Sequence, residues 1–230
     1  MTNNGVSWKY YSGDRGNDPT VFPGTVNGVP ILFHSYCGIC DPLTGYLSIM
    51  KNPSEEAKLQ NYGAFLSDLK NNSLPAVSFV RPFEALAGHP ADSTASLYEQ
   101  FIQQLIFSVQ ANRSIWDSTA IFITVDEGGG YYDSGKIQIL DFFGDGTRIP
   151  FLAVSPYAKK GFVDHTYYDH VSVSKFIERN WSLPRISSRS RDNLPNPSGN
   201  GYIPDNAPAI GDLMNLFDFE NGSGNGNGNG

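Results

Sequence analysis

Two short runs of apolar residues, at 120–125 (AIFITV) and 149–154 (IPFLAV), constrain the fold of this sequence more than any other feature. The first run is apolar at successive positions and rich in β-branched residues, which is the pattern of a strand buried on both faces of a parallel sheet. Ahead of it, an apolar residue recurs at every fourth position over residues 97–109, as in an amphipathic helix. Strand signals that alternate with helical ones predict an α/β fold in which helices flank a mostly parallel sheet.

The composition divides the sequence into stretches that we interpret as one domain over residues 1–220 and a tail. The first 60 residues are rich in Gly, Pro, Asn and Tyr and predict irregular, loop-rich structure. Residues 221–230 (NGSGNGNGNG) cannot bury apolar surface and predict a flexible tail. The middle of the chain predicts a helix at 61–70, a strand at 75–80, a helix begun by a capping box at Ser96 and Glu99, and a helix at 171–181.

The charge balance limits the partners that this chain can have. Sixteen Lys and Arg residues against 23 Asp and Glu residues give a net charge of −7. Because a sequence-independent nucleic-acid binder needs a positive face, we expect no nucleic-acid-binding surface. We expect no transmembrane segment, since no run of 18 apolar residues occurs. The first residues lack the apolar core of a signal peptide.

The two cysteines stand close together as Cys37-Gly-Ile-Cys40. A zinc site needs more soft ligands, and the sequence holds no other cysteine and only four histidines. A thioredoxin-like motif would open a helix, whereas Asp41 and Pro42 follow at once. Three interpretations stay open: ordinary thiols, a local disulfide in an oxidising compartment, or metal or redox chemistry.

Asp126 and Glu127 directly follow the 120–125 strand and precede three glycines. Ligands of parallel sheets bind beyond the carboxyl ends of the strands. Two adjacent carboxylates repel each other there unless a cation lies between them, and glycines allow the backbone to approach a ligand closely. The pair is therefore either a carboxylate site for Ca²⁺, Mg²⁺, Mn²⁺ or Zn²⁺ or a solvated turn that ends the strand.

Three of the histidines lie in loops beside predicted elements. His89 follows a predicted strand, and if that strand neighbours the 120–125 strand, its loop lies beside Asp126. An imidazole there could contact a phosphoryl oxygen or protonate a leaving group. His165 and His170 precede the last predicted helix, and His170 stands at its N-terminus, where anions are favoured. The alternatives are a loop histidine satisfied by backbone or water and a simple helix cap.

These residues lie in longer blocks that resemble the phosphoesterase family, which includes non-specific phospholipases C and a class of bacterial acid phosphatases within the alkaline-phosphatase-like superfamily. The resemblance covers nearly all of residues 6–220. Its most specific blocks are GHPADS (88–93), IWDSTAIFITVDEGGGYYD (115–133) and GTRIPFLAVSPYAKKGFVDHTYYDHVSVSKFIERNWSLP (146–184).

The resemblance implies an alkaline-phosphatase-like α/β fold and hydrolysis of phosphoric ester bonds with a divalent metal ion, by phospholipase C or acid phosphatase chemistry. We interpret Arg148, at a family position, as structural. The residues that the resemblance implies for the site are the metal ligands Asp126 and Glu127, the catalytic residues His89 and His170, and the substrate-binding residues His165 and Asp169.

The sequence also departs from the family pattern. The family's N-terminal half, with a Glu-Asn pair that shares the metal and a Ser or Thr nucleophile, is absent, so we expect the C-terminal portion of the enzyme and a fold that is incomplete relative to the family. The implied function is a metal-dependent phosphoesterase, weak or inactive alone, with a phosphate-ester substrate and a separate N-terminal half as expected partners. The alternatives are a non-catalytic module that binds metal, phosphate or a partner chain, and a truncated gene product. Relatives are often exported, but the sequence leaves the location of this chain open.

Overall fold

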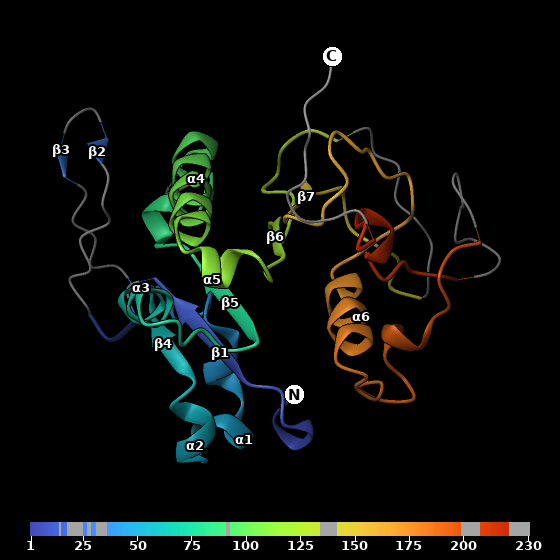
Figure 1. Cartoon of the computed structure of the whole chain (residues 1–230), viewed down its shortest axis with the longest axis horizontal. Helices are drawn as coiled ribbons and strands as arrows, with labels where there is room; N and C mark the ends of the chain where they lie inside the picture. The colour runs from blue at the N-terminus through green and yellow to red at the C-terminus, as the bar shows by residue number, and fades with distance from the viewer. Residues whose placement is uncertain are drawn as a thin grey trace. The chain divides into compact units, whose positions relative to one another are not determined.

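A computed structural model describes residues 1–13, 15–17, 25–26, 29–30, 36–90, 93–133, 142–198 and 208–220 of the chain. The chain forms two compact units, Met1–Trp116 and Asp117–Gly230 (Figure 1). The predicted flexible tail, residues 221–230, lies outside the described residues.

A parallel sheet of three strands forms the centre of the first unit (Figure 1). The middle strand β1 (Trp8–Ser12) pairs with β4 (Leu59–Asn61) on one side and with β5 (Val77–Arg81) on the other. Helix α3 (Tyr62–Lys70) follows β4 directly and packs on the sheet, where the rings of Tyr11 and Phe65 meet edge to face at 5.4 Å. The predicted α/β class, with helices against a parallel sheet, is confirmed, as are the helix at 61–70 and the strand at 75–80.

The first 60 residues carry more regular structure than predicted, because they supply the middle strand of this sheet. Strand β1 reads WKYYS and has neither the apolar run nor the strict alternation that indicates a strand. Its burial depends on the two neighbouring strands, and Tyr11 is completely buried between them and α3. The shorter elements of this stretch are the antiparallel pair β2 (Thr25–Val26) and β3 (Val29–Pro30) and the helices α1 (Leu47–Met50) and α2 (Pro53–Glu56).

Helix α4 (Ala95–Ala111) begins differently from the predicted capping box. Thr94 is the residue before the first turn, and Ser96 lies inside the helix with its Oγ 3.0 Å from Thr94 Oγ1. The two hydroxyls pair with each other, and the Thr94 side chain makes no capping bond to the helix backbone. A short helix, α5 (Arg113–Trp116), follows. None of the described helices is long and apolar enough to cross a membrane.

The second unit contains an antiparallel strand pair covered by one helix. Strand β6 (Ile121–Thr124) pairs with β7 (Phe151–Val154) over its whole length, and helix α6 (Val171–Asn180) packs on them. The ring of Phe122 contacts those of Phe176 at 4.9 Å and Phe217 at 5.9 Å. Both strands and the helix were predicted.

The interpretation of the 120–125 run as a buried parallel strand is wrong in two respects. Strand β6 is antiparallel to β7, and its residues are only half-buried. An apolar run indicates that a strand has apolar surface to bury, but it does not indicate whether the partner strand is parallel or antiparallel. Because β5 pairs with β1 whereas β6 pairs with β7, the argument that placed His89 beside Asp126 on neighbouring strands fails as well.

Cys37 and Cys40 form a disulfide, which agrees with the second of the three interpretations of this pair. The residue that follows, Asp41, is completely buried. Its carboxylate accepts hydrogen bonds from the Tyr36 hydroxyl at 2.7 Å and from the guanidinium of Arg15. The disulfide therefore lies directly beside the two residues, Tyr36 and Asp41, of this hydrogen-bonded cluster.

Candidate functional site

The chain turns sharply after β6, where Asp126 and Glu127 begin an exposed loop. Each carboxylate accepts a hydrogen bond from the backbone ahead of it: Asp126 Oδ1 from the N–H of Glu127 at 3.0 Å, and Glu127 Oε2 from the N–H of Gly129 at 2.8 Å. These bonds use one oxygen of each carboxylate and hold both acidic side chains close to the turn. Two negative charges are thereby fixed next to each other at the end of the strand.

The three glycines after this pair are each required by the local geometry. A Cβ on Gly128 would lie 2.5 Å from Thr147 Oγ1, which is far inside normal contact distance. Gly129 and Gly130 have φ values of 63° and 71°, in the left-handed region that side chains disfavour. The loop thus uses the conformational freedom of glycine, and the close approach of its backbone to a ligand stays a prediction.

His170 lies at the same end of β6 as the acidic pair. It precedes α6, as predicted, and its Nε2 is 2.9 Å from the carbonyl oxygen of Val125. Because a carbonyl oxygen only accepts, Nε2 carries the hydrogen in this contact, and Nδ1 is left for another partner. The imidazole is thus anchored to the residue directly before Asp126.

Asp169 is held in a network of charged side chains beside His170. Its Oδ1 accepts a hydrogen bond from the N–H of Val171 at 2.8 Å, and its Oδ2 lies 3.2 Å from Arg191 Nη1. Arg191 also reaches Asp145 Oδ1 at 3.0 Å. Burial raises the pKa of Asp169, the Arg191 guanidinium opposes the shift, and the Asp145 charge adds to it. This carboxylate stabilises the start of α6, and its predicted contact with substrate stays a prediction.

The remaining predicted histidines are both exposed. His165 lies in the loop before α6, next to Asp164 and Thr166. His89 lies in the first unit, after β5, and its carbonyl oxygen accepts the N–H of Ser93 at 2.8 Å. His89 and Asp126 belong to different units, so a shared centre of these two residues stays a prediction.

The described residues do not make up a complete cation site. They contain no group of three or more His, Cys, Asp or Glu side chains that could hold a metal ion together. Asp126 and Glu127 supply the carboxylate oxygens that hard divalent ions prefer, but two adjacent carboxylates are fewer ligands than such ions take. The predicted metal therefore needs further ligands beyond this pair.

Arg148 agrees with its interpretation as a structural residue. Its Nε donates to Asp133 Oδ1 at 2.9 Å, and its backbone N–H donates to Asp133 Oδ2 at the same distance. The pair ties the chain before β7 to the end of the glycine loop.

Sequence reasoning missed Arg191 and Asp145, which surround Asp169. The signal for them was weak, because single charged residues in Gly-, Ser- and Asn-rich loops are usually solvated.

Comparison with known proteins confirms the resemblance. The chain matches the model of the Phosphoesterase family over residues 1–184 and belongs to that family. Non-hemolytic phospholipase C of Burkholderia pseudomallei is 30% identical over an alignment of 180 residues, gaps included, that covers 67% of this chain and 24% of the relative. Phospholipase C B of Mycobacterium tuberculosis is 26% identical over an alignment of 204 residues, gaps included, that covers 78% of this chain and 37% of the relative.

The family also includes relatives named for a different substrate class. An acid phosphatase of Aspergillus fumigatus is 30% identical over 146 residues, which are 64% of this chain and 30% of the relative. In each of these three comparisons the matched region spans between about a quarter and somewhat over a third of the relative's length.

Proposed function

We propose that this chain takes part in the metal-dependent hydrolysis of phosphoric ester bonds, of phospholipase C or acid phosphatase type. The observation that carries the proposal is the end of β6, where an imidazole is bonded to the backbone of the residue that directly precedes two carboxylates. His170 is bonded to Val125, and Asp126 and Glu127 follow directly. Family membership and the names of the relatives support the reaction class.

In this proposal, Asp126 and Glu127 are two of the ligands of a divalent metal ion. The chemistry supplied by such an ion is neutralisation of the charge on phosphoryl oxygens. The backbone bonds to Asp126 Oδ1 and Glu127 Oε2 orient both carboxylates before a ligand arrives. The imidazole of His170 contacts a phosphoryl oxygen or holds the proton that the leaving alcohol takes up, and we propose the same kind of role for His89.

We further propose that the nucleophile and the missing metal ligands belong to a part of the family's domain that these 230 residues do not include, such as a separate N-terminal half. The relatives are several times longer than the matched region, which supports this proposal. The hydroxyl at the end of β6 does not argue for a nucleophile within the chain. Thr124 Oγ1 donates to the carbonyl oxygen of Pro150 at 2.9 Å, and a carbonyl oxygen is not a base that could activate it.

A thermal melt with divalent ions tests the metal assignment. We expect Ca²⁺, Mg²⁺, Mn²⁺ or Zn²⁺ to raise the melting temperature of the chain, because an ion that binds only the folded state stabilises it by mass action. Asp126→Ala and Glu127→Ala should abolish that rise. Glu56→Ala, at an exposed position of the first unit, is the matched control and should respond like the unchanged chain. A melt that ignores all four ions, or acidic-pair variants that respond normally, would remove the assignment.

An activity assay with an aryl phosphate tests whether the nucleophile lies outside this chain. The chain alone should show very weak or no turnover, because loss of a nucleophile costs several orders of magnitude in rate. Robust metal-dependent turnover by the isolated chain would show that the nucleophile lies within it. Metal binding without turnover, even after addition of an N-terminal half from a relative, would favour the second candidate, a non-catalytic module that binds metal, phosphate or a partner chain.

A further inference from the structure

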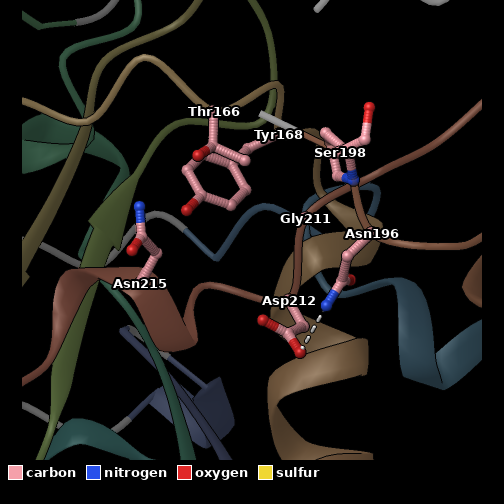
Figure 2. Close-up of a pocket in the computed structure, with 8 residues that line it drawn as sticks. Thr166, Tyr168, Asn196, Ser198, Gly211, Asp212 and Asn215 are labelled. Carbon is pink, nitrogen blue, oxygen red and sulfur yellow. Dashed lines mark hydrogen bonds between the residues drawn. The ribbon is translucent and has the colours of Figure 1, made fainter. Parts of the chain in front are cut away.

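A polar cavity of about 310 Å³ lies in the second unit, and neither Asp126 nor Glu127 lines it (Figure 2). Its wall consists of three segments, at 166–168, 196–198 and 211–215. Ligand-binding cavities in proteins have volumes of roughly 300–1,000 Å³, so this one is large enough for a single small molecule. None of the six residues proposed above for phosphoester chemistry lines it.

One side of the cavity is organised by Asp164. The hydroxyl of Tyr168 donates to Asp164 Oδ2 at 2.6 Å, and Nδ2 of Asn215 donates to the same oxygen at 3.0 Å. Burial works against ionisation of Asp164, but these bonds and those from Thr166 lower its pKa below the usual value. Because a carboxylate only accepts, the amide of Asn215 must turn its nitrogen to Asp164, which leaves its Oδ1 as an acceptor for another group.

The other side is organised by Asp212 in the same way. Nδ2 of Asn196 donates to Asp212 Oδ2 at 2.9 Å, the bond drawn in Figure 2, and Arg179 Nη1 donates to that oxygen at 2.8 Å. Asn196 therefore also keeps its Oδ1 for another partner. The guanidinium of Arg179 balances the charge of Asp212, so this side of the cavity is close to neutral.

The cavity is held open by packing as well as by hydrogen bonds. A Cβ on Gly211 would lie 2.3 Å from Cε1 of Tyr168, so the ring rests directly on the glycine backbone. The N–H of Gly211 donates to the carbonyl oxygen of Tyr167 at 2.9 Å. This contact with Gly211 holds the Tyr168 ring in place. The two sides of the cavity therefore keep their separation.

We propose that this cavity binds a small neutral polyhydroxylated molecule, such as a polyol or a monosaccharide. A hydroxyl group donates and accepts at once, and the cavity offers both kinds of partner: the amides of Asn196 and Asn215 and the hydroxyls of Thr166 and Ser198. An anion would meet the carboxylates of Asp164 and Asp212. A cation would gain little from Asp212, whose charge Arg179 already balances, or from Asp164, both of whose oxygens already accept hydrogen bonds from Tyr168, Asn215 and Thr166.

Binding to the full 230-residue chain, followed by calorimetry or ligand-observed NMR, tests the proposal with D-glucose and glycerol as probes. We expect saturable binding in the millimolar range, and Asn196→Ala and Asn215→Ala should each weaken it roughly fivefold, the effect of one lost hydrogen bond. Asn71→Ala, at an exposed asparagine of the first unit, is the matched control and should bind like the unchanged chain.

Inorganic phosphate and tetramethylammonium serve as the charged competitors. Failure of both hydroxylated probes to bind overturns the proposal, as does a charged probe that binds and loses affinity in Asn196→Ala. Because Asn196→Ala removes a partner of Asp212 and can destabilise the fold, Ser198→Ala provides a second variant at an exposed lining residue. Ser198→Ala should weaken glucose binding with an unchanged melting temperature, and unchanged glucose binding in it counts against the proposal.

Discussion

Nε2 of His170 and the carbonyl oxygen of Val125 lie 2.9 Å apart, so the start of α6 is bonded to the end of β6. The two residues are separated by 45 positions in the sequence, and this contact brings an imidazole to the residue before Asp126. The bond has two roles in our account: it stabilises the junction of the two elements, and it sets the orientation of the ring.

The two roles of His170 can be separated by substitution. His170→Ala should destabilise the chain by about 1 kcal/mol, because the bond to Val125 is lost. His170→Gln, whose Nε2 can reach the same carbonyl oxygen, should keep most of that stability while losing the imidazole. Urea unfolding measures the difference. Equal losses in the two variants would mean that the hydrogen bond contributes nothing measurable.

Gly128→Ala should destabilise the second unit by about 1–3 kcal/mol, because its Cβ would overlap Thr147 Oγ1. Thr147→Ala removes that oxygen, so the double variant should recover most of the loss, which a double-mutant cycle reveals as coupling. Gly146→Ala is the control, since nothing lies within 4 Å of its added Cβ. A loss of stability that Thr147→Ala leaves unchanged would contradict the steric explanation.

The charge of Asp212 should make stability depend on pH in the acidic range. Burial opposes its ionisation, but bonds from Asn196, the N–H of Met214 and Arg179 lower its pKa below the usual value. A carboxyl whose pKa is lowered by folding stabilises the folded state above the unfolded pKa of about 3.9, and this stabilisation is lost as pH falls through the folded value.

Asp212→Asn should therefore be less stable than the unchanged chain by about 1–3 kcal/mol at pH 7, and the gap should narrow below about pH 4. Denaturant melts between pH 3 and pH 7 measure the gap. Glu56→Gln, at an exposed position, is the control and should show a small gap throughout. A gap for Asp212→Asn that is constant down to pH 3 would contradict the linkage.

Reduction of the disulfide should loosen the loop around Asp41. The bridge between Cys37 and Cys40 closes a small ring, for which the loss of chain entropy corresponds to roughly 2 kcal/mol. Dithiothreitol should lower the melting temperature, and a variant with both cysteines replaced by serine should melt at the reduced value whether or not reductant is present. An unchanged melt under reducing conditions would show that the bridge is dispensable for the first unit.

The sequence predicted those elements whose apolar pattern is local. Strands β6 and β7 and the helices α3 and α6 follow from short runs and helical spacing. Strand β1 and the antiparallel pairing of β6 could not be predicted in this way, because both depend on partners far along the chain. Burial of Tyr11, for example, is decided by β4, β5 and α3 and not by its neighbours in the sequence.

In the candidate site, too, local features could be predicted and contacts between distant segments could not. The acidic pair and its glycines could be identified from five consecutive residues, since their chemistry and their position after a strand are visible together. The anchoring of His170 on Val125 and the involvement of Asp169 with Arg191 could not, because each contact joins segments that only the fold brings together. The polar cavity escaped notice for the same reason, as Asn196 and Asn215 stand in loop sequence that by itself indicates only solvated turns.

The position of β1 in the middle of its sheet has a consequence for synthesis on the ribosome. The partners of β1, Leu59 on one side and Val77 on the other, emerge roughly fifty and seventy residues after it. Both edges of β1 and the side chain of Tyr11 stay uncovered until those residues leave the ribosomal exit tunnel. The nascent chain therefore exposes an aggregation-prone strand for longer than a protein whose strands pair in hairpins would. Producing the chain at lower temperature, or with a chaperone that covers extended segments, should raise its soluble yield more than changes at its exposed surface.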